Sequence, residues 1–153
     1  MVRIPPPPPP PPPRSKAAFG VVARDGGGGI KWWFSGTVVA SSALFTEAWA
    51  LRIACIAAKD WGLREVHFET DCLELVNTVN NRNVDGAWEI YALVEDILAL
   101  ANNCNWVFLW CNRARNRAAH WVAQSKMSSS FVGSGDIPAG LRAVLDSDVM
   151  LLS

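Results

Sequence analysis

Two carboxylates, Glu47 and Asp71, are the residues whose type and setting point most directly to chemistry. Glu47 lies in the apolar stretch LFTEAWAL, where helical spacing puts it on the same side as Leu44 and Leu51. Asp71 ends the segment VHFETD, whose pattern predicts a strand that carries an acid at its tip. Two acids that meet at one end of a sheet provide oxygen ligands for a divalent cation.

Each of these acids also has a simpler interpretation. Glu47 can be an ordinary residue of a helix surface. Asp71 can be the N-cap of the next helix, because the sequence DCLE that begins with it resembles a capping box. A cap needs no metal, so the position of the two side chains in the fold has to decide between these interpretations.

The composition bounds the class of protein. A chain of 153 residues, half of them apolar, is long enough for one globular domain with a core. The formal net charge is zero, from 14 basic and 14 acidic residues, so binding to nucleic acid would require a local basic patch. The sequence has no apolar run of about 18 residues, so we expect no membrane-spanning helix. We also expect a monomer.

The cysteines indicate the compartment. The chain has four of them, with no CxxC motif and no short cluster of Cys and His. This pattern predicts reduced, mostly buried thiols in an intracellular protein, nuclear or cytoplasmic, and it argues against a zinc site.

The first 16 residues form a leader of low complexity. Residues 5–13 are nine consecutive prolines, which cannot join a helix or an interior strand and favour a polyproline II rod. Such a rod is a ligand for SH3 or WW domains, and Arg3 and Arg14 flank it as basic cues. The alternative is a leader without a partner.

The remainder of the chain predicts alternating strands and helices. The turn sequence DGGGG at residues 25–29 separates two β-rich segments, which indicates a hairpin. Ser41 and Ser42 offer an N-cap for the first helix, and Gly62 ends it. A tail over residues 127–153 follows a domain over residues 17–126, in an α/β layer pattern. The expected elements are strands at 17–24, 30–40, 64–70 and 105–110, and helices at 43–61, 72–81, 88–101 and 115–126.

Four blocks of sequence, in this order, carry a resemblance to a known family. They are FGVVARD at residues 19–25, EAWALR at 47–52, ETDCLELVN at 69–77 and RARNRAAHWVA at 113–123. Together they resemble the ribonuclease H fold, and more closely the reverse-transcriptase-like RNase H domains common in plant genomes. The resemblance covers residues 19–126. It implies an RNase H-like mixed β-sheet flanked by helices.

The resemblance also implies a reaction and its residues. The family hydrolyses the RNA strand of an RNA–DNA hybrid with two Mg²⁺ or Mn²⁺ ions held by four acids. By resemblance, Glu47 is the acid of the first helix and Asp71 the acid at the strand tip, and both are candidate metal ligands. His120 stands where the acid of the last helix belongs, as a further candidate catalytic residue or, alternatively, as a partly buried, hydrogen-bonded histidine.

A basic patch is the candidate for contact with nucleic acid. Arg113, Arg115 and Arg117 lie close together in the sequence and could meet phosphates. Three arginines at the start of a helix can equally form a solvated face. The sequence leaves both interpretations open.

The first acid of the family pattern is absent. No Asp or Glu precedes Asp25, which belongs to the hairpin turn, and the proline run takes the place of the strand that should carry the acid. We therefore expect the first, central strand to be missing, with open strand edges beside its place. This departure suggests a truncated or mis-spliced gene model, or a degenerate copy derived from a retroelement.

Three functions follow from these observations. The first is an RNA–DNA hybrid ribonuclease, an endonuclease that we expect to be impaired here because a carboxylate is lost. The second is a non-catalytic RNase H-like relic that binds nucleic acid or protein. The third is a proline-rich interaction module that acts through residues 5–13.

Overall fold

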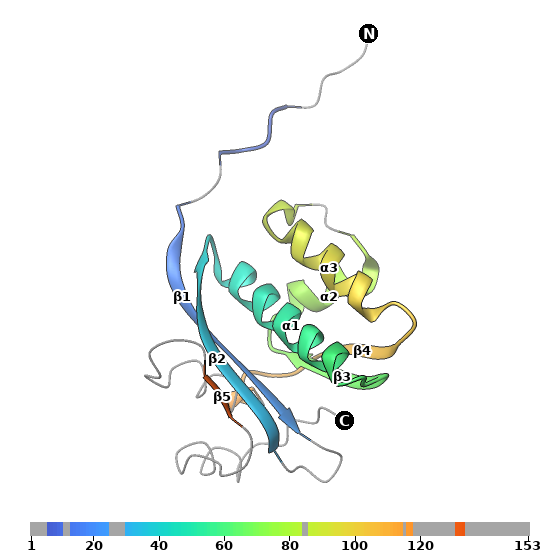
Figure 1. Cartoon of the computed structure of the whole chain (residues 1–153). Helices are drawn as coiled ribbons and strands as arrows, with labels where there is room; N and C mark the ends of the chain where they lie inside the picture. The colour runs from blue at the N-terminus through green and yellow to red at the C-terminus, as the bar shows by residue number, and fades with distance from the viewer. Residues whose placement is uncertain are drawn as a thin grey trace.

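The computed structural model describes residues 6–10, 13–24, 30–83, 86–114, 116–117 and 131–133, and of residues 24, 30, 31 and 131–133 the backbone only. The described elements are five strands, three α-helices and one short 3₁₀ helix. Figure 1 shows the helices together on one side of the strands, with residues 6–10 away from the body.

A long hairpin forms the first sheet. Strand β1 (Ser15–Arg24) pairs antiparallel with β2 (Ile30–Ala40), and Ser15 lies opposite Ala40. Alternate side chains, among them Phe19, Val21 and Trp32, are buried in one cluster with side chains of α1. A third, short strand, β5 (Phe131–Gly133), pairs antiparallel with β2.

Helix α1 (Ala43–Asp60) is bounded by the signals that its sequence carries. The Oγ of Ser42 accepts a hydrogen bond from the backbone N–H of Phe45 at 3.1 Å, which caps the first turn. Gly62 adopts a φ of +69° after the last turn, a conformation that favours glycine. Both ends of the helix agree with the prediction.

The second sheet is a parallel pair. Strand β3 (Glu65–Thr70) pairs with β4 (Asn105–Trp110), and Thr70 lies opposite Trp110, so both strands end at the same edge. Helix α2 (Leu73–Asn81), the 3₁₀ helix η1 (Trp88–Ile90) and α3 (Tyr91–Ala101) lie between these strands in the chain. The main core lies here, and its fully buried side chains include Leu75, Ile90 and Ile97.

Helix α1 connects the two sheets. Ala48, Leu51 and Cys55 pack into the core of β3 and β4, whereas Trp49 and Ala54 pack against both this core and the cluster on the hairpin. The described residues contain no strand that joins the sheets, whose orders are β1-β2-β5 and β3-β4. The expected mixed α/β architecture is thus present, but its single sheet is divided in two.

The structure also departs from the predicted elements at specific points. The interpretation of Asp71 as an N-cap is wrong, because Cys72 holds that position and makes no side-chain capping bond. Strand β5 lies within the expected tail and was not predicted, since three residues show no periodicity and pair only through their backbone. Most of the predicted helix at 115–126 lies outside the described residues.

No helix within the described ranges combines the length and the apolar character that crossing a membrane requires.

Candidate active site at the ends of β3 and β4

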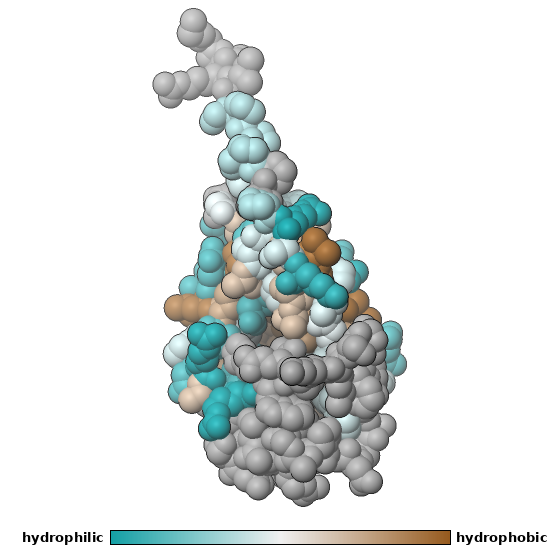
Figure 2. Space-filling model, turned by 90° about the vertical axis from the view of Figure 1, so that its left-hand side faces the viewer, coloured by the Kyte–Doolittle hydropathy of each residue, from teal (hydrophilic) through white to brown (hydrophobic). Residues whose placement is uncertain are grey.

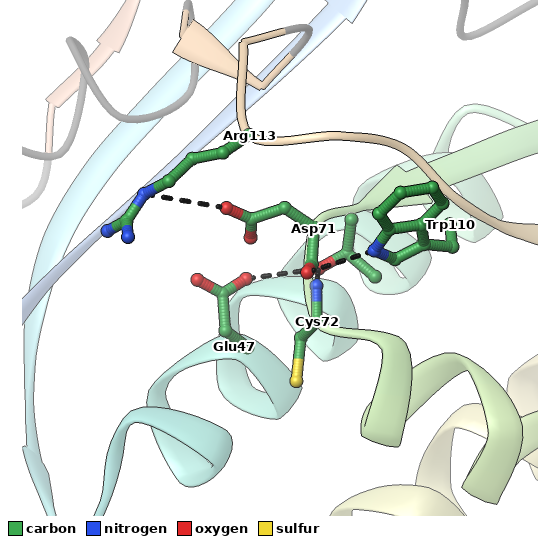
Figure 3. A network of polar contacts seen from close by, with 6 residues as sticks. Glu47, Asp71, Cys72, Trp110 and Arg113 are labelled. Carbon is green, nitrogen blue, oxygen red and sulfur yellow. Dashed lines mark hydrogen bonds and ion pairs between the residues drawn. The ribbon is translucent and has the colours of Figure 1, made fainter.

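The parallel pairing of β3 and β4 places the residues after both strands at one edge, next to the first turns of α1. Thr70, the last residue of β3, joins these elements. Its Oγ1 donates a hydrogen bond to Oε2 of Glu47 at 3.1 Å and accepts one from the backbone N–H of Cys72 at 3.2 Å (Figure 3). Glu47 is therefore held from the strand end, and it is not a free residue of the helix surface.

Asp71 lies at the tip of β3, as the sequence predicted. Its backbone oxygen accepts a hydrogen bond from Nε1 of Trp110, the residue that ends β4, at 3.2 Å. The Asp71 side chain is only 14% exposed. Figure 3 shows the carboxylates of Glu47 and Asp71 on the same side of the strand end, directed into a shared space.

Arg113 approaches this pair from the segment after β4. The backbone N–H of Cys111 donates to the oxygen of Thr70 at 3.0 Å, which continues the pairing of the strands by one residue. A turn follows, in which the N–H of Asn116 donates to the oxygen of Arg113 at 3.2 Å. Nε of Arg113 then lies 4.0 Å from Oδ2 of Asp71, with an arginine side chain that is 84% exposed (Figure 3).

The pKa of the Cys72 thiol depends on burial and on the nearby carboxylates. Burial is the main reason that its pKa is raised above the usual value, and the backbone N–H of Leu75 opposes this shift. The nearby carboxylates of Glu47, Glu74 and Asp71 raise the pKa further, because a thiolate beside them would add like charge. Glu47 and Asp71 thus both lie near Cys72, although they are 24 residues apart in the sequence.

An open groove of mixed polar and apolar lining lies along α2. Leu73 and Glu74, which follow directly after Cys72, line its beginning, and the amides of Asn77, Asn81 and Asn83 continue it. This groove was not among the predicted sites. The signal that could have revealed it is the spacing of Asn77 and Asn81, which puts two small polar side chains on one helical face.

The structure describes four of the six candidate residues. The structure brings Glu47, Asp71 and Arg113 together at one edge, and it leaves the side chain of Arg117 exposed. Arg115 and His120 lie outside the described residues, so their roles stay predictions.

The described side chains of this site do not supply the ligands that two divalent ions would need. Among the described residues no three of His, Cys, Asp or Glu gather into a group able to hold a metal ion. The two carboxylates supply oxygen ligands, but a guanidinium lies beside one of them. In the part of the chain that is described, the residues do not fit a two-metal centre.

The architecture with its carboxylate-bearing edge is similar to that of the RNase H-like proteins. The chain belongs to the reverse transcriptase-like family, whose model matches residues 13–126. Comparison with curated proteins gave no match.

Solved structures of RNase H domains share this fold. The crystal structure of RNase H1 from the halophilic archaeon Halobacterium salinarum is similar with a TM-score of 0.66 and 22% identity, over 72% of this chain and 85% of that one. The N-terminal RNase H domain of a Mycobacterium tuberculosis protein, solved as a fusion with maltose-binding protein, gives a TM-score of 0.53 and 18% identity. That match covers 73% of this chain and 91% of the other.

Proposed function

We propose that this chain binds RNA–DNA hybrids through an RNase H-type domain and cleaves them weakly or not at all. The observation that carries the proposal is the meeting of Glu47, Asp71 and Arg113 at the common end of β3 and β4, within an RNase H-like fold. Membership of the reverse transcriptase-like family supports nucleic acid as the ligand.

Two features suit the binding of a hybrid duplex. Arg113 and Arg117 are exposed, and a guanidinium group is suited to contact with phosphates. The amides of Asn77 and Asn81 offer donors and acceptors to 2′-hydroxyls, which proteins contact in the shallow minor groove of A-form helices. The phosphate contacts would supply most of the affinity, and the amides the preference for a strand with 2′-hydroxyls.

Impaired cleavage follows from the carboxylates. Glu47 and Asp71 match acids of the family pattern by resemblance, and the described residues supply no third ligand beside them. A phosphodiester is cleaved efficiently where paired metals activate the water and stabilise the leaving oxygen. We propose that the pair holds at most one Mg²⁺ or Mn²⁺, and holds it weakly.

The binding proposal is tested by fluorescence anisotropy with a labelled RNA–DNA hybrid and a DNA duplex of the same sequence. We expect tighter binding to the hybrid. Replacing both Asn77 and Asn81 by Ala should reduce that preference, whereas Arg117→Gln should weaken binding to both duplexes alike. Equal affinity for the two duplexes in the natural sequence would contradict the assignment of a hybrid as ligand.

The leader supports a second candidate function. Residues 6–10 are exposed and belong to no strand, and they lie away from the body in two views (Figure 1, Figure 2). Arg14, which comes directly after the last proline of the run, is also exposed. We propose that this run binds a domain with an aromatic groove and an acidic pocket, of the SH3 or WW type.

Replacing the five prolines 6–10 by alanine removes every pair of prolines spaced three apart in the run. We expect this variant to lose binding to a panel of isolated SH3 and WW domains while its hybrid affinity stays the same. Arg14→Glu should weaken SH3 binding selectively, because it reverses the charge presented to an acidic pocket. If no domain of the panel binds the natural chain, the proposed function of the proline run is contradicted.

A further inference from the structure

We propose that the outer edge of β4 is an interaction surface and that its partner is a second copy of this chain, paired strand to strand through β4. The surface consists of the backbone edge of β4 and the exposed side chains of Val107 and Leu109. This inference does not depend on the binding of nucleic acid or of a metal ion.

The backbone groups of β4 alternate in direction, because the strand is paired regularly with β3. Asn105 and Cys111, at the two ends of the ladder, donate their N–H groups to oxygens on the β3 side at 2.7 and 3.0 Å. The odd-numbered residues therefore face β3, and the even-numbered residues direct their N–H and C=O groups to the outer edge. The residues with outward-facing backbone groups are Trp106, Phe108 and Trp110.

One of these outward-facing groups takes part in a described hydrogen bond. Nδ2 of Asn80, on α2, donates to the oxygen of Phe108 at 3.1 Å. Helix α2 reaches the edge from the buried face of the sheet, where Val79 packs in the same core cluster as Phe108. Among the described strands none pairs with the outer side of β4. In this part of the chain β4 is therefore an open edge that Asn80 covers at one carbonyl.

The side chains of β4 add an apolar surface beside this edge. Val107 is 41% exposed and Leu109 is 38% exposed, on the face of the sheet opposite to the core. The segment CNWVFLWCN, residues 104–112, has no charged side chain. Edge strands of native proteins are commonly protected by charged residues or proline, because uncharged apolar edges pair with other chains. The sequence of β4 lacks both kinds of protection.

A second copy of β4 fits this edge in an antiparallel register centred on Phe108. Because Phe108 faces outward, the two copies of this residue can exchange both backbone hydrogen bonds across a twofold axis. The same register places Val107 of one copy opposite Leu109 of the other, in pairs that bring the side chains close together. Every cross-strand pair over residues 106–110 is uncharged, so no like charges meet and the surface is complementary to itself.

The expected assembly is a weak, reversible dimer. One strand pair buries less than the roughly 1,200 Å² at which stable interfaces begin, so association should appear in the high-micromolar range. Sedimentation equilibrium of the full chain at a series of concentrations measures it. The monomer expected from the sequence would then be the state at lower concentration.

Val107→Glu tests whether the dimer forms at this edge. The variant sets a charge among the apolar cross-strand pairs, and the twofold axis makes it act twice, so we expect the dissociation constant to rise about ten-fold. Val39→Glu is the matched control, because Val39 is an exposed valine on β2, in the other sheet. It should leave the dissociation constant unchanged.

Asn80→Ala tests the competition between α2 and the second copy. Loss of the side chain frees the oxygen of Phe108, so the dimer should tighten by about two- to ten-fold, the net worth of one hydrogen bond. Asn81→Ala changes the same residue type one position further along α2, where no hydrogen bond to β4 is described. This control should leave the dimer as it is in the natural sequence.

The register is tested by mixing Val107→Cys with Leu109→Cys under mild oxidation. Directly opposed residues of a non-hydrogen-bonded antiparallel pair are close enough for a disulfide. The proposed register opposes the two introduced thiols only between unlike chains. We expect mass spectrometry to find a link between positions 107 and 109 in the mixture, and no such dimer in either variant alone.

Four results would overturn the inference. The edge is no self-association surface if neither the natural chain nor Asn80→Ala forms a dimer in the high-micromolar range. Equal weakening by Val107→Glu and Val39→Glu would place the contact elsewhere. Equal dissociation constants for Asn80→Ala and the natural sequence would contradict the role of Asn80, and cross-linking of the single variants as strong as in the mixture would contradict the register.

Discussion

At the scale of single residues, the buried thiol of Cys55 makes the stability of the core depend on pH. Its side chain is fully buried on α1, in the core shared with Leu51 and Ala58. Burial raises the pKa of this thiol far above its usual value, because a thiolate in an apolar core loses its hydration. The folded state therefore binds this proton more tightly than the unfolded state does.

The sign of the pH effect follows from this difference. The contribution of Cys55 to stability is fully present below the pKa of the unfolded chain, about 8.5, and is lost as pH rises toward the folded pKa. We expect the free energy of unfolding to fall above that pH by about 1.4 kcal/mol per unit from this residue. Urea denaturation at a series of alkaline pH values measures it.

Cys55→Ala is the control for this prediction. It leaves the contribution of Cys72, whose pKa is also raised, and removes that of Cys55. The variant should be less stable at neutral pH because it leaves a cavity, but its stability should decline less steeply in alkali. Parallel pH profiles for the two proteins would contradict the account.

At the scale of elements, two serines with different hydrogen bonds hold the start of α1. Oγ of Ser41 donates to Oε2 of Glu89 at 2.8 Å, and Oγ of Ser42 donates to Oε1 of the same side chain at 2.7 Å. Ser42 alone also accepts the capping bond from the N–H of Phe45. These contacts tie α1 to η1.

Replacing each serine in turn distinguishes the contribution of the N-cap from that of the hydrogen bonds to Glu89. Ser42→Ala should cost about 1 kcal/mol more in free energy of unfolding than Ser41→Ala, since it removes the N-cap as well as a bond to Glu89. Chemical denaturation of the two variants beside the natural sequence provides the comparison. Equal losses would mean that the cap contributes nothing beyond the contact with Glu89.

Much of this arrangement could be predicted from local sequence. The apolar period of α1, its Ser42 cap and Gly62 fixed that helix almost to the residue, and β2 and β4 match their expected bounds. Strand β5 could not be predicted, because its pairing with β2 is made by backbone atoms of a distant segment. The partition of the strands into two sheets is likewise a property of tertiary pairing.

The candidate site was predictable in part for the same reason. Glu47 and Asp71 stand out as acids in apolar patterns, and family resemblance indicates that they meet. The approach of Arg113 to Asp71 depends on the register of β3 and β4 and on the turn after β4, neither of which a local pattern encodes. The sequence instead suggested Arg113 only as a member of a basic patch.

At the scale of the whole molecule, the balance of charge limits how nucleic acid can be held. With 14 basic and 14 acidic residues the chain has no general attraction for a polyanion, so affinity must come from a few local contacts. Arg113, Arg115 and Arg117 are the candidates for these contacts.

The salt dependence of hybrid binding measures the number of such contacts. Three phosphate contacts predict a slope of about −2 to −3 in a plot of log affinity against log salt concentration. Arg117→Gln should reduce the slope by about one unit. A slope as steep as about −6 would require many more basic contacts than this patch offers and would contradict the proposed interface.

The central proposal is that this RNase H-like domain carries two carboxylates at its candidate site without an effective metal centre. The most direct test is the rate of cleavage of a labelled RNA–DNA hybrid by the purified chain in Mg²⁺, beside Glu47→Gln. The account predicts that both proteins cleave at the same background rate. Mg²⁺-dependent cleavage by the natural chain that Glu47→Gln abolishes would contradict it and establish a working hybrid ribonuclease.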